Sequence, residues 1–394
     1  MMNIAIIAVA YNRVDSLERL LNSLDQAIYP EGRNVPLIIS VDKSNTDKVE
    51  LFSDAFQWTH GVKIVDKHEV NLGLRPHMLS LGKWFEHYDA IIILEDDIIV
   101  SPNFYTYTIQ TVNKYYNCPS IAGISLYGYS YNYHTLIPFQ PIKDENDVYF
   151  MNCAMSWGEV WMRDSWRLFY EWYLQHQDFP VMNHLPSSIC RWNKKSWLKY
   201  HTRYCIENNK YFVHPFVSLS TCFSEPGEHS QGSDTAYSQV VMQQGIKESY
   251  LLPDFGGKAE YYDGFFENKS LYTTLGYSSE ELCIDLYGEK KNRLNCRYWL
   301  TAEVRNYRIL KSFGLGYRPI ELNVISNFPG NQLYLYDTQY VEKNPNSPNH
   351  NVLLYNYHIH TIESFIYQYG YFNVVKELLG MFFRKITRFH KKTK

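Results

Sequence analysis

The stretch Ala90–Tyr105 reads A-I-I-I-L-E-D-D-I-I-V-S-P-N-F-Y and joins an aliphatic run to three consecutive acids. A short apolar run rich in β-branched residues predicts a strand buried on both faces, as in a parallel sheet covered by helices. Ser101 and Pro102 suit the N-cap and the first position of a following helix. Acids at the carboxyl end of such a strand lie where open α/β sheets bind ligands.

The three acids Glu95, Asp96 and Asp97 are the main functional signal in the chain. Adjacent carboxylates repel one another, and burying them is costly unless a cation or hydrogen bonds compensate. One interpretation is a plain acidic turn after the strand. We favour a divalent-metal site of the D-x-D type, because turns seldom place three acids and no glycine after so apolar a strand.

Composition limits the class of protein. The chain has 394 residues, enough for one large or two ordinary domains with a substantial core. Its 45% hydrophobic and 20% charged residues indicate a globular protein rather than a disordered one. The net charge of −3 argues against nucleic acid as a partner. The 35 tyrosines suit carbohydrate-binding faces, but they suit ordinary cores as well.

The cysteines and the N-terminus favour a cytoplasmic protein. Seven cysteines are scattered and never spaced as C-x-x-C, which fits buried thiols in a reducing compartment better than disulfides or a zinc site. The apolar run near the N-terminus is too short for a signal peptide and has no basic leader. No stretch approaches the ~20 apolar residues that a membrane-spanning helix needs.

Strands and helices alternate along the first third of the chain, which predicts a doubly wound α/β sheet. Leu17, Leu20, Leu21 and Leu24 have helical spacing, and Asp15 or Ser16 can cap their helix. The predicted strands cover residues 4–10, 37–41, 62–65, 91–94 and 121–126, and later helices run to about residue 58, through residues 78–85 and over residues 104–116.

Two familiar phosphate-binding patterns are absent. The chain contains neither a P-loop nor the G-x-G-x-x-G fingerprint of dinucleotide-binding sheets. A glycine-rich cradle therefore does not hold the phosphates of any nucleotide that binds here. A metal ion on the three acids would supply that charge compensation instead.

These patterns resemble the GT-A glycosyltransferases, in particular glycosyltransferase family 2 and the N-acetylglucosaminyltransferase I type. The resemblance covers about the first 130 residues well and residues 153–230 more loosely, whereas the last third has no counterpart. The matching motifs are A-V-A-Y-N-R at residues 8–13, I-I-S-V-D at 38–42, N-L-G-L-R-P-H at 71–77 and L-E-D-D-I-I-V-S-P-N-F-Y at 94–105.

The resemblance implies a nucleotide-sugar donor site with Mn²⁺ or Mg²⁺ as cofactor. Asp97 would ligate the metal directly, which suits a hard cation that neutralises a departing nucleoside diphosphate. The donor-binding residues would be Ala10, Tyr11, Arg13, Asp42, Arg75, Glu95 and Asp96. Within this set, Arg13 and Arg75 would lie near the phosphates and Asp42 near the base. Alternatively, Arg13 and Arg75 are solvated surface residues, and Asp42 caps the next helix.

An acceptor side is implied around Trp157 and Gly158. Trp157 offers a flat apolar face for a sugar ring, and Gly158 permits close approach. Trp161 and Trp166 suit an ordinary core at least as well. His229, in the polar loop 224–230, would join the metal or a phosphate, although a loop histidine more often faces solvent.

An inverting transferase needs a general base for the acceptor hydroxyl. The family places an aspartate before a tryptophan in a W-D-D-W-like segment, but here W-N-K-K-S-W at residues 192–197 has Ser196 at that position. Serine cannot act as a base unaided. Glu159, next to the Trp157-Gly158 turn, is our predicted replacement, with Asp164, Glu225 and Glu228 as alternatives.

The C-terminal part divides into an extension and a tail. We predict domains at residues 1–257, 258–341 and 342–394, with Tyr298–Leu310 helical, short strands and turns over residues 318–337, and an exposed linker at 342–351. Apolar residues at positions 375–389 fall on one helical face among many lysines and arginines. Such a basic amphipathic helix suits an anionic membrane surface. A contact with its own domain, or with a second copy, is the alternative.

The resemblance implies a metal-dependent glycosyltransferase, and the basic tail predicts that it is cytoplasmic and peripheral on the inner face of the cytoplasmic membrane. It would move a hexose or N-acetylhexosamine, with inversion, from a UDP-sugar to a hydroxyl of a glycan or lipid-linked acceptor. Capsule or lipopolysaccharide biosynthesis would be the setting. The alternatives are a sugar nucleotidyltransferase, which usually has a glycine-rich phosphate loop that this chain lacks, and a non-catalytic carbohydrate-binding protein.

Overall fold

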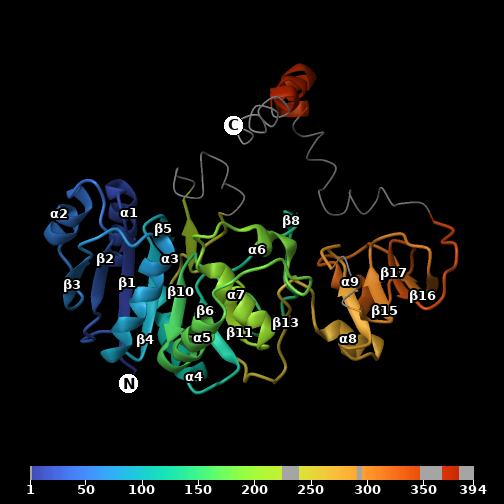
Figure 1. The fold of residues 1–394 in the computed structure, drawn as a ribbon, viewed down its shortest axis with the longest axis horizontal. Coiled ribbons are helices and arrows are strands. Elements are labelled where there is room, and N and C mark those ends of the chain that lie inside the picture. Colours follow the sequence, from blue (N-terminus) through green and yellow to red (C-terminus); the bar gives the residue numbers. More distant parts are fainter. Residues whose placement is uncertain (1, 224–238, 291–294, 347–365, 381–394) are drawn as a thin grey trace.

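A nine-stranded sheet forms the larger part of the computed structural model, which describes residues 2–223, 239–290, 295–346 and 366–380 (Figure 1). The five strands predicted between residues 4 and 126 are present, with their ends shifted by at most two residues. From one edge to the other the strands are β3 (Lys63–Lys67), β2 (Leu37–Val41), β1 (Ile4–Ala10), β4 (Ala90–Glu95), β10 (Glu159–Met162), β6 (Ile121–Ser125), β11 (Tyr211–Pro215), β9 (Val148–Met151) and β13 (Tyr261–Tyr262).

The direction of the strands changes at β10. Strands β1 to β4 are parallel to one another, whereas β10 runs antiparallel to both of its neighbours, β4 and β6. The order β3-β2-β1-β4 is that of the first half of a doubly wound sheet. The predicted α/β class with a doubly wound mixed sheet is therefore confirmed.

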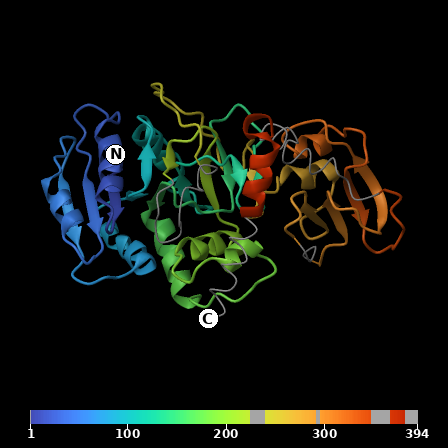
Figure 2. The ribbon, with the colours of Figure 1, turned by 90° about the horizontal axis from the view of Figure 1, so that it is seen from above.

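Side chains that alternate along β1 enter two separate cores, one on each face of the sheet. Ile4, Ile6 and Ala8 enter the first core, and Ala5 and Ile7 enter the second. Figure 2 shows the green helices of the second face along one side of the sheet. The first face carries α1 (Val14–Asp25), α2 (Lys48–Ala55) and α4 (Phe104–Tyr115), and the second carries α3 (Leu74–Ser80), the 3-10 helix η1 (Leu81–Glu86), α5 (Arg163–Gln175) and α7 (Leu198–Glu207).

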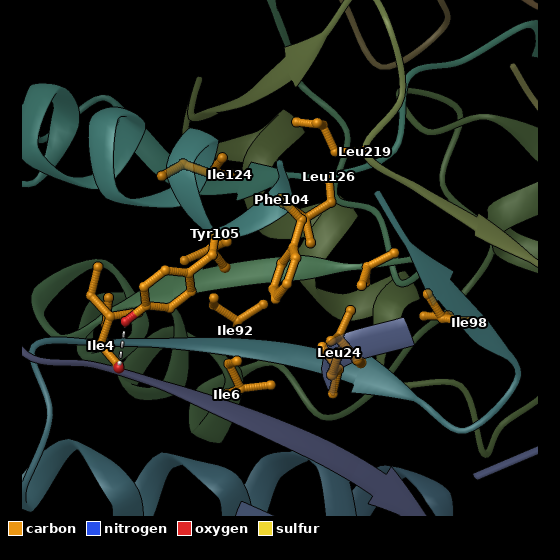
Figure 3. Close-up of a cluster of buried hydrophobic side chains, with 14 of the residues drawn as sticks. Ile4, Ile6, Leu24, Ile92, Ile98, Phe104, Tyr105, Ile124, Leu126 and Leu219 are labelled. Atoms are coloured by element: carbon orange, nitrogen blue, oxygen red, sulfur yellow. Dashed lines mark hydrogen bonds between the residues drawn. The ribbon is translucent and has the colours of Figure 1, made fainter. Parts of the chain in front are cut away.

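Aromatic residues of α4 fill the first core (Figure 3). Phe104 and Tyr105 lie near Ile92 of β4 and Leu24 of α1, and all four side chains are buried. The Tyr105 hydroxyl donates to the Ile4 carbonyl at 3.4 Å. Burying each large apolar side chain contributes about 1.5–3 kcal/mol. This packing holds α1 and α4 against β1 and β4, and β4 ends at the three acids.

Two predicted helix caps are wrong. Helix α1 begins at Val14 with Arg13 in the N-cap position, so Asp15 and Ser16 already lie inside the helix. Helix α4 begins at Phe104 with Asn103 in the N-cap position. Ser101 lies two residues earlier, where its hydroxyl accepts the Asn103 amide at 3.2 Å and donates to the Gln243 carbonyl at 2.5 Å.

A four-stranded sheet follows the large sheet and has its own hydrophobic core. The prediction that Tyr298–Leu310 is helical is wrong, because β15 pairs with strands on both sides and β16 closes one edge. Long-range pairing decided this segment, whose own residues have no clear period. The elements are α8 (Ser270–Leu275), β14 (Leu282–Asp285), β15 (Tyr298–Thr301), β16 (Arg308–Phe313), α9 (Glu321–Ile325) and β17 (Leu333–Asp337).

Short elements complete the described residues. Strand β5 (Ile98–Val100) pairs antiparallel with β12 (Ser220–Cys222), β7 (Tyr131–Asn132) pairs with β8 (Ile137–Pro138), and α6 (Ser187–Arg191) precedes α7.

The seven cysteines are free thiols, as predicted, and five of them are buried. Because β13 belongs to the large sheet, residues 258–341 contain its last strand as well as the small sheet. The predicted domain boundaries stay a prediction.

Residues 366–380 form a helix that stands apart from both sheets in Figure 1. Tyr367, Tyr371 and Phe372 are among its exposed apolar residues. The rest of the predicted tail helix, residues 381–394, and part of the predicted linker lie outside the described residues. Among the described helices, none has the length and apolar character needed to cross a membrane.

Candidate donor and metal site

The carboxyl ends of three neighbouring parallel strands bring the predicted donor residues to one edge of the sheet. Val9 of β1 is in register with Glu95 of β4, and Ala10 is in register with Val41 of β2. The Asp42 amide donates to the Ala10 carbonyl at 2.9 Å. The turn that follows β1 therefore lies between the end of β2 and the acids that end β4.

The acids occupy a tight connection between β4 and β5. Glu95 is the last residue of β4, and Asp96 and Asp97 form the turn. The Asp96 side chain is 7% exposed and that of Asp97 is 28% exposed. An acidic turn is thus present, and Asp97 is more accessible to a ligand than Asp96.

Arg13 reaches these acids from the turn after β1. Its Nε donates to Asp96 Oδ2 at 3.2 Å and its Nη2 donates to Asp97 Oδ2 at 3.1 Å, with a further contact from Nη2 to Asp96 Oδ1. Burial opposes the guanidinium charge, but Asp96 and Asp97 raise the pKa of Arg13 above its ordinary value. Arg13 is therefore a partner of the acids rather than a solvated surface arginine.

One donor of Arg13 is left over. Its Nη1 is buried and has no hydrogen-bond partner within the described part of the chain. A buried donor without an acceptor costs about 1–3 kcal/mol. An anionic ligand at this edge of the sheet would provide the missing acceptor.

Glu95 has an unusual protonation equilibrium. Burial and the charges of Asp97 and Asp96 raise its pKa to about 8, although Arg13 acts in the opposite direction. Burial and the neighbouring carboxylates therefore disfavour the charged form of Glu95.

The donor set fits a cation that arrives with an anionic ligand. No group of three or more His, Cys, Asp or Glu side chains among the described residues is arranged to hold a metal ion alone. Mg²⁺ commonly takes only one or two carboxylates and completes its shell with phosphate oxygens and water. Asp97 is accessible and lies beside the unpartnered donor of Arg13, which suits such an open site.

Asp42 holds the loop that precedes α3. Its carboxylate accepts the amides of Lys43 at 2.9 Å, Leu72 at 2.8 Å and Gly73 at 2.9 Å. Helix α2 begins at Lys48, so Asp42 does not cap it. Gly73 has φ of +76°, which a side chain would strain. Asp42 is buried, and it fixes this loop against the end of β2.

Arg75 lies against α7 rather than against the acids. Its Nη1 donates to the Tyr200 hydroxyl at 2.8 Å. Its guanidinium carbon lies 5.1 Å from the centroid of the Tyr200 ring. The structure therefore brings Arg13, Asp42 and the acids together and sets Arg75 to one side of them.

The predicted base Glu159 is inside the second core. Its side chain is 1% exposed, and Oε1 lies 3.1 Å from Nδ1 of the equally buried His201. Burial raises the pKa of Glu159 well above its ordinary value and lowers that of His201 to about 3. A protonated carboxyl without solvent access does not meet an acceptor hydroxyl, so the structure gives this role no support.

The alternative bases are not better placed. Asp164 is in the first turn of α5, which follows Met162, and Met162 pairs with Ala90 at the amino end of β4. This position is at the opposite edge of the sheet from Asp97. Glu225, Glu228 and His229 lie outside the described residues.

Trp157 and Gly158 lie close to the acid turn, on the segment that precedes β10. The Trp157 ring is half-buried and packs edge-on against Tyr127 at 4.9 Å between centroids. Gly158 has φ of +98°, and a Cβ there would lie 2.9 Å from Ser220 Oγ. The close approach that glycine permits is thus to β12 of the same chain. Trp161 and Trp166 stack in the second core, as the alternative interpretation expected.

The sequence did not predict a contact between the acid turn and β12. The Phe223 amide donates to the Asp97 carbonyl at 2.8 Å, and the Arg19 guanidinium lies 4.7 Å from the Phe223 ring centroid. Only the pairing of β5 with β12 brings these residues together. No local pattern in the sequence indicates that pairing.

Comparisons with known proteins give structural similarities only. No family model matches the sequence. A search of curated proteins found no match either. The mannosyltransferase PcManGT from Pyrobaculum calidifontis, in complex with GDP-Man and Mn²⁺, is similar with a TM-score of 0.35 and 10% identity over 54% of this chain and 55% of its own.

Two further solved structures are similar at the same level. TarS of S. aureus in complex with UDP-GlcNAc has a TM-score of 0.37 and 13% identity over 58% of this chain and 60% of its own. GalNAc-T7 with UDP, GalNAc and Mn²⁺ has a TM-score of 0.40 and 16% identity over 59% of this chain and 46% of its own. The chain thus spans about half the length of the structures it matches. Because these TM-scores and identities are low, the proposals below rest on the residues of this chain.

Proposed function

We propose that this protein is a metal-dependent glycosyltransferase of the GT-A type that uses a nucleotide-diphosphate sugar. The observation that carries the proposal is the convergence of Arg13, Asp42 and the acids 95–97 at the carboxyl edge of β1, β2 and β4. This edge is where doubly wound sheets bind nucleotides. The order of these residues along the chain is also that of the GT-A motifs they resemble.

Each residue has a proposed role in donor binding. Asp97 holds Mn²⁺ or Mg²⁺, which neutralises the charge of the departing diphosphate. Arg13 orients Asp96 and Asp97 and offers Nη1 to a phosphate oxygen. Ala10 and Tyr11 present backbone to the nucleoside in the turn after β1, and Asp42 sets the neighbouring loop.

The finer assignment follows the sequence resemblance. It gives UDP as the nucleotide, a hydroxyl of a surface glycan or its lipid-linked precursor as the acceptor, and inversion at the transferred sugar. The acceptor enters on the side of Trp157, whose half-buried ring leaves one part accessible. The exposed helix 366–380 and the basic residues that follow it in the sequence support attachment to an anionic membrane.

The decisive experiment is calorimetric titration of UDP with Mn²⁺ into the wild type and the Asp97→Asn variant. We expect the variant to lose at least about tenfold in Mn²⁺-dependent affinity, equivalent to about 1.4 kcal/mol. Asp254→Asn is the matched control, because that carboxylate is exposed and pairs only with Lys114 at the surface. Equal Mn²⁺-dependent affinity in wild type and Asp97→Asn would overturn the metal site.

A non-catalytic carbohydrate-binding protein is the second candidate, favoured by the burial of Glu159. The two functions differ in turnover of the donor. A transferase hydrolyses a UDP-sugar slowly when metal is present and no acceptor is added, and a binding protein releases no UDP. We expect Mn²⁺-dependent release of UDP from at least one UDP-hexose or UDP-N-acetylhexosamine.

A further inference from the structure

Two cations surround one buried tyrosine at the start of α7. Arg75 donates to the Tyr200 hydroxyl at 2.8 Å and lies over its ring. The Nζ of Lys199 lies 5.5 Å from the same ring centroid and 4.3 Å from the ring centroid of Phe179. The Tyr200 hydroxyl in turn donates to the Gln177 carbonyl at 2.9 Å, so it is occupied as a donor.

These two charges lack a counter-ion. Lys199 is only 3% exposed, yet neither it nor Arg75 forms an ion pair with any carboxylate in the described ranges of the chain. Burial and the nearby charge of Arg75 lower the pKa of Lys199. The aromatic rings contribute about 0.5–2 kcal/mol of cation–π attraction, but they do not neutralise the charge. The side chain of Lys199 is thus nearly enclosed by the protein, and its ammonium is suited to an anionic ligand.

Arg75 and Lys199 lie at the carboxyl edge of the large sheet, where the proposed nucleotide-sugar donor binds. Arg75 is in the first turn of α3, two residues after Gly73. The Gly73 amide donates to the Asp42 carboxylate. Helix α7 leads into β11, and β11 is parallel to β6, which runs in the same direction as β4. The start of α7 therefore lies at the carboxyl edge, on the face opposite α1. Lys199 and Arg75 thus meet at the edge that carries the acids.

We propose that Arg75 and Lys199 form a phosphate-binding site between α3 and α7, at the same edge of the sheet as the proposed metal site. The proposal rests on the proposed function, because it assigns the site to a phosphate of a transferase substrate. Arg75 presents a planar fork of donors and Lys199 a compact point charge, a pair that suits phosphate oxygens. The phosphate belongs either to the donor diphosphate or to a phosphorylated acceptor.

The test is calorimetric titration of inorganic pyrophosphate without divalent cations, so that Asp97 cannot contribute through a metal. We expect Lys199→Gln and Arg75→Gln each to lower the affinity at least about tenfold. Lys199→Arg should retain binding, because it keeps the charge. Lys311→Gln is the matched control, since Lys311 is an exposed lysine of β16 in the small sheet. Circular dichroism checks that each variant is folded.

The site is overturned if the wild type does not bind pyrophosphate, or if folded Lys199→Gln and Arg75→Gln bind it as the wild type does. Competition with UDP then identifies the source of the phosphate. Displacement of pyrophosphate by UDP with Mn²⁺ assigns the site to the donor, and simultaneous binding assigns it to the acceptor. Loss of Mn²⁺-dependent UDP binding in Asp97→Asn tests the function separately, so the two proposals can fail independently.

Discussion

Glu159 illustrates how burial changes the chemistry of a single carboxyl group. In the sequence it follows the Trp157-Gly158 turn, where a base would be useful. In the structure it points into the second core toward His201, and its pKa is raised by burial. Its neighbours, including Phe169 stacked on His201, keep water away from the pair. The residue is better suited to a structural role than to proton transfer.

Replacing Glu159 by glutamine tests this revision. We expect Glu159→Gln to retain donor turnover within a few-fold of the wild type, because the amide mimics the protonated carboxyl. A folded pKa above the unfolded value means that wild-type stability falls as pH rises from about 4.5 toward the folded pKa. The variant should therefore gain stability relative to the wild type by up to about 1.4 kcal/mol per pH unit over that range.

Chemical denaturation at pH 4.5 and pH 8 measures this difference. The two proteins should unfold at similar denaturant concentrations at the lower pH, and the variant should be more stable at the higher one. Abolished turnover together with intact Mn²⁺-dependent UDP binding would instead restore Glu159 as the base.

At the scale of elements, the contact between β2 and the loop before α3 is the clearest organising feature of the site. The Asp42 carboxylate holds the Leu72 and Gly73 amides, and α3 then starts at Leu74. Because Arg75 follows within one turn, the position of its guanidinium depends on these hydrogen bonds. A carboxylate at the end of one strand thus determines where a neighbouring helix begins.

Removing this carboxylate should release the loop. Asp42→Ala removes the carboxylate acceptor of the part-buried amides of Leu72 and Gly73, which should cost about 2–4 kcal/mol of unfolding free energy. Denaturant unfolding gives this value, and hydrogen exchange at the two amides should accelerate. Asp47→Ala is the matched control, because Asp47 precedes α2 without a side-chain cap. Unchanged exchange at Leu72 and Gly73 in Asp42→Ala would contradict the anchoring role.

At the scale of the whole molecule, the chain combines two sheets with an exposed helix. The nine-stranded and four-stranded sheets have separate cores, and Figure 1 shows them at opposite ends of the molecule. Tyr371 and Phe372 of helix 366–380 are exposed by 72% and 83%. The large sheet carries the proposed chemistry, and the exposed helix is the proposed membrane contact.

Sedimentation with lipid vesicles tests the membrane attachment of the full chain. Replacing Tyr371 and Phe372 together by serine should weaken binding to phosphatidylglycerol vesicles at least about tenfold, because burial of each aromatic ring contributes about 1.5–3 kcal/mol. Neutral phosphatidylcholine vesicles should bind less protein than anionic ones. Leu251→Ser, at an exposed apolar position outside this helix, should have no effect. Equal recovery of the double variant and wild type would contradict the proposal.

Short-range pattern predicted much of the large sheet. The strands at residues 4–10, 37–41 and 121–125 follow from apolar runs, and α1 follows from its leucine spacing. The small sheet was not predicted, because β15 and β16 acquire their strand conformation by pairing with β17, which is distant in the sequence.

The sequence by itself determined that three acids follow one buried strand and that Arg13 and Asp42 follow two others, which the structure identifies as β1 beside β4 and β2 beside β1. Periodicity and strand direction are local properties, and parallel strands necessarily share a carboxyl edge. Only the tertiary structure decided which side chains meet there. In the tertiary structure Arg13 donates to Asp96, and Arg75 donates to the Tyr200 hydroxyl. Glu159 is buried beside His201. Those contacts depend on how helices from distant parts of the chain pack on the sheet, and burial then determines each group's protonation.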